Sequence, residues 1–197
     1  MKKTETQFRI CIGIAALLLF AILLSKRVIA APTESSIQVK IDASKAVPRD
    51  VEDQTQQAIV RDYGKAWQSL EQALENNRSD LLSAGFVGIA RDRLGSALAE
   101  QSKSGMSRRV VDRGHQLQVL FYSIEGSAMQ LRDTAQLEVQ YLEGGKVLHS
   151  ERLTSYYIVL MTPAENSWKV RILQEVPSES PQQASESGVS GGAAGSK

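Results

Sequence analysis

The chain has 197 residues, a formal net charge of +1 and 23% charged residues, which are ordinary values for a protein that carries one soluble domain. A net charge this close to zero argues against a general nucleic-acid-binding protein, so we expect no nucleic-acid partner. The single cysteine, Cys11, and only two histidines exclude an intramolecular disulfide, a CxxC motif and a histidine-rich metal site. We therefore expect neither a metal nor a cofactor.

The N-terminal segment is apolar. Residues 10–24 carry no charge, and Lys26, Arg27 and a second apolar stretch at residues 28–31 follow them. Fifteen helical residues span about 22 Å, which is shorter than the ~30 Å hydrocarbon core of a bilayer. A helix continued to residue 31 reaches about 33 Å, provided that the two basic side chains extend to the headgroups. Residues 1–31 are therefore predicted to be a cytoplasmic N-terminus and a signal anchor. Cleavage as a secretory signal peptide after residues 28–30 is the alternative, and would release a secreted soluble form.

The flanking segments set the predicted location. Basic residues before the apolar stretch favour a cytoplasmic N-terminus, so the rest of the chain is expected outside the membrane, in the periplasm if the protein is bacterial. Residues 32–50 are predicted to be a spacer, although the alternation of Ile37, Val39 and Ile41 also fits a short strand. Residues 178–197 lack the apolar residues needed for a core and are predicted to be disordered.

The domain between these segments, residues 51–177, begins with helical periodicity. Apolar residues recur every three or four positions from Ile59 to Leu74, which predicts an amphipathic helix that ends near residues 76–77. A second helical stretch starts at residues 81–82, with a plausible break near Gly85, and Gly105 ends it.

Strand patterns follow the helices. Strands are predicted at residues 116–125, 129–141, 147–161 and 167–176, with turns at residues 126–127 and 143–146. Helices followed by an antiparallel meander indicate an α+β domain. We expect two amphipathic helices packed on a curved four-stranded antiparallel sheet.

The long helix carrying Tyr63 and Trp67, the second helical segment and the closing strand SWKVRILQEVP, residues 167–177, resemble the nuclear-transport-factor-2-like superfamily. This resemblance covers residues 50–177 and implies a cone between sheet and helix. The superfamily includes steroid isomerases and dehydratases, but none of their motifs can be matched here residue by residue. A membrane helix followed by such a domain also resembles the inner-membrane assembly components of type IV secretion systems, which implies a protein-binding scaffold.

The candidate pocket residues are polar or aromatic residues expected to face the cone, namely Tyr63, Trp67, His115, Asp133 and Tyr157. Asp112 lies three residues before His115, so its carboxylate could orient the imidazole for proton transfer. Asp133 stands among apolar-face residues and could act as a general base or bind a polar ligand.

Each candidate also has a plainer interpretation. Residues 108–115 read as a charged surface connection, and Asp133 could be turned outward by a β-bulge or paired with an arginine. Tyr63 and Trp67, at helical spacing, fit a core, and His149 fits a partly exposed strand position.

The densest basic cluster of the domain, Arg108, Arg109 and Arg113, is a candidate contact for anionic lipids, an acidic partner or RNA, and the net charge near zero disfavours RNA. With no catalytic set matched, we expect a membrane-tethered, non-enzymatic extracytoplasmic domain for protein binding or assembly with copies of itself. The alternative is a small-molecule-binding or isomerase-like or dehydratase-like cone. An enclosed cavity lined by the candidate pocket residues would favour it, and a cone filled by Trp67, Phe121 and the leucines would argue against it.

Overall fold

The computed structural model describes residues 38–177, so the predicted anchor and the predicted disordered tail lie outside the described residues. Among the described residues, no helix combines the length and the apolar character needed to cross a membrane. The elements are β1 (Val39–Asp42), α2 (Asp53–Asn76), the 3-10 helix η1 (Ser79–Ala84), α3 (Gly88–Ser104), β2 (Met106–Tyr122), β3 (Met129–Glu143), β4 (Lys146–Ala164) and β5 (Ser167–Val176).

Helix α2 follows the apolar period of the sequence. Its buried face includes Ile59, Tyr63, Trp67 and Leu70, which recur at three- and four-residue steps. The helix ends where Asn77 adopts a left-handed conformation and donates its backbone N–H to the Ala73 carbonyl. The predicted end near residues 76–77 is confirmed.

The second helical segment breaks at Gly85, as predicted. The break allows the chain to pair with β5, because Val170 N–H donates to the Gly85 carbonyl and Val87 N–H donates to the Val170 carbonyl. A side chain at Gly85 would collide with the α2 backbone, since its Cβ would lie 2.3 Å from Cα of Ala66. Helix α3 then ends at Gly105, which takes a positive φ of 71° as its C-cap.

The sheet is five-stranded and mixed, in the order β1-β2-β3-β4-β5. Strands β2 to β5 form the predicted antiparallel meander, but β1 pairs parallel to β2, with Val39 beside His115. The expectation of a four-stranded antiparallel sheet is therefore wrong at this edge. Residues 39–42 come from the stretch assigned to the spacer; they complete the edge because Val39 and Ile41 pack against the core.

Strand β2 begins ten residues earlier than predicted, at Met106, and the interpretation of residues 108–115 as a surface connection is wrong. Two irregularities, between Asp112 and Gly114 and between Val119 and Phe121, shift the pairing of β2 with β3. Each one changes which residues face the core, so a strict period of two is not visible in the sequence.

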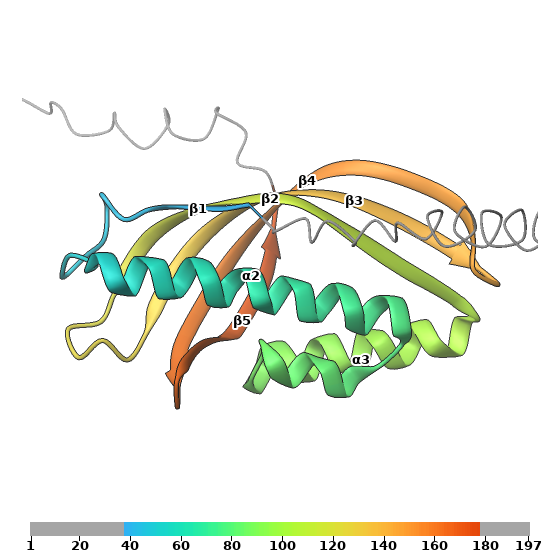
Figure 1. Ribbon diagram of the computed structural model, residues 1–197, viewed down its shortest axis with the longest axis horizontal. Helices are drawn as coiled ribbons and strands as arrows, with labels where there is room; N and C mark the ends of the chain where they lie inside the picture. The colour runs from blue at the N-terminus through green and yellow to red at the C-terminus, as the bar shows by residue number, and fades with distance from the viewer. Residues whose placement is uncertain (1–37, 178–197) are drawn as a thin grey trace, which may run out of the picture. The chain divides into compact units, whose positions relative to one another are not determined.

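The helices α2 and α3 lie on the same side of the curved sheet, and the core forms between them and the sheet (Figure 1). Strands β3 and β4 continue together beyond the end of β5. Strand β5 pairs with Tyr156–Ala164, and Pro177, which has no N–H to donate, follows its last residue. Within residues 38–177, residues 146–155 of β4 are therefore paired on one side only, by β3.

Candidate functional site

Four buried polar side chains form a continuous hydrogen-bonded chain between α2 and the sheet. The Tyr63 hydroxyl donates to Oδ2 of Asp133 at 2.7 Å, and Nδ1 of His115 lies 2.7 Å from the same oxygen. The other ring nitrogen of His115, Nε2, lies 2.6 Å from Oδ2 of Asp112. All four residues are buried, Tyr63 and Asp133 completely. We call this set the polar cluster.

Local sequence places the two β2 members of the polar cluster. The irregularity between Asp112 and Gly114 brings both Asp112 and His115 to the inner face of the sheet. The second carboxylate oxygen of Asp112 accepts from the Gly114 N–H at 2.8 Å, which stabilises the bulge. Asp133 is in phase with the buried Leu131 on β3, so the alternative that a bulge turns Asp133 outward is wrong.

The two carboxylates control the protonation of His115. Burial by itself lowers the pKa of the imidazole, but hydrogen bonds to Asp112 and Asp133 outweigh it and raise the pKa to about 9. The ring is therefore an imidazolium at neutral pH, and each of its N–H groups donates to a carboxylate. Burial, followed by the charge of Asp133, raises the pKa of Tyr63 well above 10, so its hydroxyl remains a neutral donor.

Aromatic rings surround the imidazolium. The Trp67 ring lies 4.6 Å from the His115 ring between centroids, and the Tyr63 ring meets it edge-on at 5.2 Å. A cation near an indole face is stabilised by the ring quadrupole. Trp67 also contacts Tyr157, at 5.6 Å between centroids.

A cavity of about 330 Å³ lies between the helices and the inner face of the sheet. Its lining is Trp67, Leu70, Leu74, Leu94, Arg108, Val110, Leu137, Val139, Tyr141, Leu153, Ser155, Tyr157, Leu173 and Glu175. Of the five candidate pocket residues, Trp67 and Tyr157 line this cavity, whereas Tyr63, His115 and Asp133 do not. Because Trp67 lines the cavity and its ring contacts His115, which does not line the cavity, Trp67 lies between the cavity and the imidazole.

The cavity offers a few polar groups in an otherwise apolar lining. Nε of Arg108 and Nε1 of Trp67 are buried and have no hydrogen-bond partner within residues 38–177. On the β4–β5 side, the Ser155 hydroxyl donates to Oε1 of Glu175 at 2.9 Å, and burial raises the pKa of Tyr157. A buried donor without an acceptor is energetically costly, so Arg108 is suited to an incoming anionic or carbonyl group.

The structure does not bring the three arginines of the predicted basic cluster together. Arg108 lines the cavity, Arg109 pairs with Glu75 of α2 at 2.6 Å, and Arg113 pairs with Glu138 of β3 at 2.7 Å. The last two arginines therefore already have carboxylate partners.

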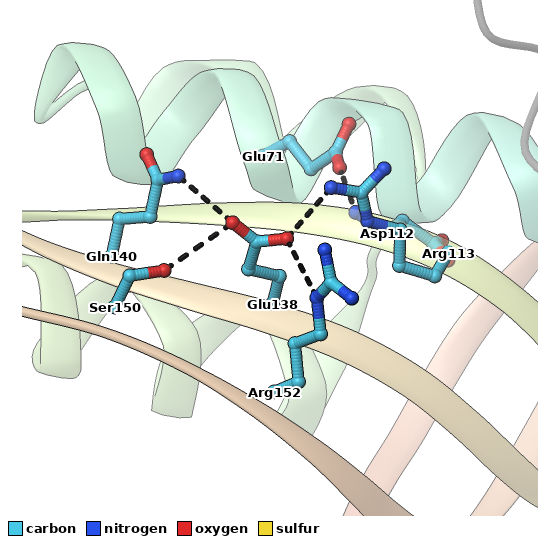
Figure 2. A network of polar contacts seen from close by, with 7 residues as sticks. All are labelled: Glu71, Asp112, Arg113, Glu138, Gln140, Ser150 and Arg152. Atoms are coloured by element: carbon cyan, nitrogen blue, oxygen red, sulfur yellow. Dashed lines mark hydrogen bonds and ion pairs between the residues drawn. The ribbon is translucent and has the colours of Figure 1, made fainter.

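Figure 2 shows the polar network around Glu138 on β3. Arg113 from β2, Arg152 from β4, Gln140 and Ser150 all donate to its carboxylate. These donors, Arg113 foremost, lower the pKa of Glu138 to about 2.

Two acidic residues of these networks were not among the sequence candidates. The alternation of polar and apolar residues in β3 predicted that Glu138 faces outward, but it did not predict which residues hydrogen-bond to it. Glu71 on α2 accepts from the Asp112 backbone N–H at 2.7 Å, a contact visible in Figure 2. No sequence signal indicates it, because 41 residues separate the two groups. Within residues 38–177, no three His, Cys, Asp or Glu side chains are arranged to hold a metal ion.

A long helix and a second helix on one face of a curved sheet, with a cavity between the layers, define a helix-on-sheet α+β domain. This architecture agrees with the predicted α+β class, with β1 as an additional parallel strand. The sequence matches no protein-family model and no curated protein.

Among solved structures, the intermembrane space region of the chloroplast protein ARC6 is similar, with a TM-score of 0.55 and 14% identity. The match covers 66% of this chain and 100% of that one, and shows a shared fold. A putative scytalone dehydratase from Novosphingobium aromaticivorans matches with a TM-score of 0.41 and 14% identity, over 59% of this chain and 83% of that one. Aln2 from a Streptomyces species matches with a TM-score of 0.42 and 12% identity, over 64% of this chain and 93% of that one.

Proposed function

We propose that residues 38–177 form a non-enzymatic binding domain that receives an apolar segment of a protein partner in the cavity between helices and sheet. The observation that carries this proposal is the cavity itself, which is lined mainly by apolar side chains and contains the unpartnered Nε of Arg108. Binding sites combine these two features, an apolar lining and a few convergent polar groups that fix orientation.

The state of the polar cluster supports a binding role rather than catalysis. A general base needs a free lone pair within hydrogen-bond reach of its substrate. Both nitrogens of His115 face carboxylates, and Trp67 lies between the imidazole and the cavity. The polar cluster therefore serves to fix α2 against β2 and β3, which makes the cavity wall rigid.

The proposal includes the tether and the location. We propose that residues 10–31 anchor the chain and that the domain lies outside the cytoplasmic membrane, on the basis of the apolar segment and the basic residues before it. An alkaline phosphatase fusion placed after Pro177 should be active in a bacterial host. An inactive fusion would place the domain on the cytoplasmic side.

Site-specific photocrosslinking in the full chain tests the binding role. A photoreactive residue replaces Leu94, which lines the cavity from α3, and in a matched control it replaces Glu100, whose side chain on the same helix is 74% exposed. We expect a discrete protein adduct from position 94 that is absent at position 100 and weaker in an Arg108→Gln background. Monomer alone at both positions, or equal labelling from both, contradicts the proposal.

A small-molecule-binding or enzymatic cone is the second candidate, because about 330 Å³ also suits a small ligand and Tyr63, His115 and Asp133 lie behind Trp67. Native mass spectrometry of the purified full chain separates the two candidates. A small molecule that co-purifies stoichiometrically and is lost in Arg108→Gln would favour this second function.

A further inference from the structure

Residues 146–155 of β4 form a sheet edge that is unpaired within residues 38–177. Binding of a partner in the cavity does not by itself explain this edge. Residues 146–155 pair with β3 on one side, and within residues 38–177 no group hydrogen-bonds to the backbone of their other side. The segment contains neither proline nor glycine, and Val147 and Leu148 are 43% and 53% exposed. Such an edge is a template for a further strand.

The opposite edge of the sheet is closed in a different way. Beyond the short strand β1, β2 is covered by α2, because Glu71 accepts from the Asp112 N–H and Glu75 pairs with Arg109. Within residues 38–177, residues 146–155 of β4 have no such contact on their unpaired side. This edge borders the cavity, since Leu153 and Ser155 belong both to the edge and to the cavity lining.

We propose that this edge binds an extended segment of the protein partner, which adds to β4 as an antiparallel strand over residues 149–155. The inference rests on the proposed binding function and names the form of the partner. A strand added here lies in line with β5, and its alternate side chains enter the cavity beside Leu153.

The side chains of the edge define the chemistry of the segment. On the inner face, Leu153 stands opposite Leu137 of β3 and needs an apolar neighbour, whereas Glu151 stands opposite Val139 and needs a basic one. On the outer face, Arg152 is 80% exposed and shares the Glu138 carboxylate with Arg113. Because two arginines share one carboxylate, Arg152 can pair with an acidic residue of the added strand. The segment therefore carries successive apolar, acidic and basic residues opposite Leu153, Arg152 and Glu151.

The chain's own tail does not supply this pattern. Residues 178–197 contain one aliphatic residue larger than alanine, Val189, and no acidic residue directly precedes a basic one there. A protein partner is consequently the occupant that the edge fits best.

Synthetic peptides test the proposal on the full chain in detergent micelles. The probe is the fluorescent heptapeptide Val-Thr-Leu-Glu-Lys-Thr-Tyr, written in the order that runs antiparallel to residues 149–155. We expect anisotropy to show binding, and hydrogen exchange to slow at those amides of residues 149–155 that do not donate to β3. The same peptide N-methylated at alternate residues cannot make the edge hydrogen bonds and should not bind.

A charge exchange distinguishes a specific register from general adhesion. A cross-strand ion pair is worth up to about 1 kcal/mol, so wild-type protein should prefer the glutamate peptide over its lysine counterpart about two- to fivefold. The Arg152→Glu variant, altered at an exposed side chain, should reverse that preference. An unchanged preference overturns the proposal.

Two further outcomes also overturn it. Protection, in the protein alone, of those amides of residues 149–155 that do not donate to β3 would mean that the tail or a second copy already covers the edge. Crosslinking from position 94 without any peptide-dependent protection of β4 would leave the binding function standing and remove the strand-addition mode. Loss of both signals would instead remove the proposed function itself.

Discussion

Nδ1 of His115 lies 2.7 Å from Oδ2 of Asp133, so an imidazolium on β2 and a carboxylate on β3 form an ion pair that is completely removed from solvent. The same carboxylate oxygen accepts the Tyr63 hydroxyl, which ties α2 to both strands. A buried ion pair is stabilised by further hydrogen bonds, and Asp112 supplies the second acceptor for the ring, although Oδ1 of Asp133 has no partner among the described residues. This arrangement makes the stability of the domain depend on pH.

Stability should decrease at alkaline pH because His115 loses its proton. The pKa of the imidazole is 6.5 in the unfolded reference and about 9 in the folded protein. The stabilisation is therefore complete below pH 6.5 and is lost as the pH rises through about 9. Each pKa unit corresponds to about 1.4 kcal/mol, so the contribution is on the order of 3 kcal/mol. Urea unfolding between pH 6.5 and 9.5 measures it.

Two controls accompany the urea measurement. The His115→Gln variant, which has no proton to lose, should show a flatter profile over the same pH range. Imidazole ¹⁵N chemical shifts should titrate near pH 9 in the folded wild type. A titration near pH 6.5 would show that the two carboxylates do not hold the proton.

Removal of the Tyr63 hydroxyl should destabilise the fold. Tyr63→Phe keeps the buried ring and deletes the donor to Asp133, whose other oxygen, Oδ1, already lacks a partner in the described part of the chain. A hydrogen bond to a charged group contributes about 1.5–3 kcal/mol, and we expect a loss in that range. Tyr141→Phe is the matched control, because no hydrogen bond of that hydroxyl occurs within the described residues. Equal effects of the two substitutions would show that the Tyr63 hydroxyl contributes nothing specific.

Glu138 should stay ionised in strong acid. Its pKa is about 2, against an ordinary 4.5, with Arg113 the leading cause. The sign follows from the lowered pKa: the interaction stabilises the fold above pH 4.5 and is lost as the pH falls toward 2. The ¹³C chemical shift of the Glu138 carboxyl follows this titration directly. Arg113→Gln should move the midpoint upward, whereas Arg91→Gln, an exposed change outside the network, should not.

Periodicity predicted the elements whose pattern is uninterrupted. The apolar period of α2 runs from Ile59 to Leu74 without a break, and the alternation in β3 is similarly regular from Met129 to Val139. Periodicity failed in β2, because the bulge at Asp112–Gly114 exchanges the inner and outer faces within a charged sequence. It also left β1 ambiguous, since a four-residue strand is stable only when a neighbouring edge accepts it.

The candidate site followed the same division. Tyr63 and Asp133 are in phase with an apolar face, so the sequence could predict that they are buried and that each needs a hydrogen-bond partner. The sequence could not predict which residues those partners are, because this depends on how α2 docks on the sheet. Two of the five candidates line the cavity and three lie behind Trp67, a distinction that only the packing creates.

Two glycines differ in the space around them and allow a matched pair of substitutions. Gly85, at the break between the helices, lies against α2, whereas Gly95 lies in open space. Gly85→Ala would place a Cβ 2.3 Å from Cα of Ala66 and 2.6 Å from its Cβ, and neither backbone can move without disturbing the pairing with Val170. Overpacking of this kind costs about 1–3 kcal/mol.

Gly95, in the interior of α3, has nothing within 4 Å of the same position. Gly95→Ala should therefore stabilise the fold by about 0.5–1 kcal/mol through helix propensity alone. Thermal unfolding of the two variants beside the wild type measures both changes. If both substitutions raise the melting temperature, Gly85 at the end of η1 does not lie this close to Ala66 of α2. The packing of η1 on α2 would then differ from this arrangement.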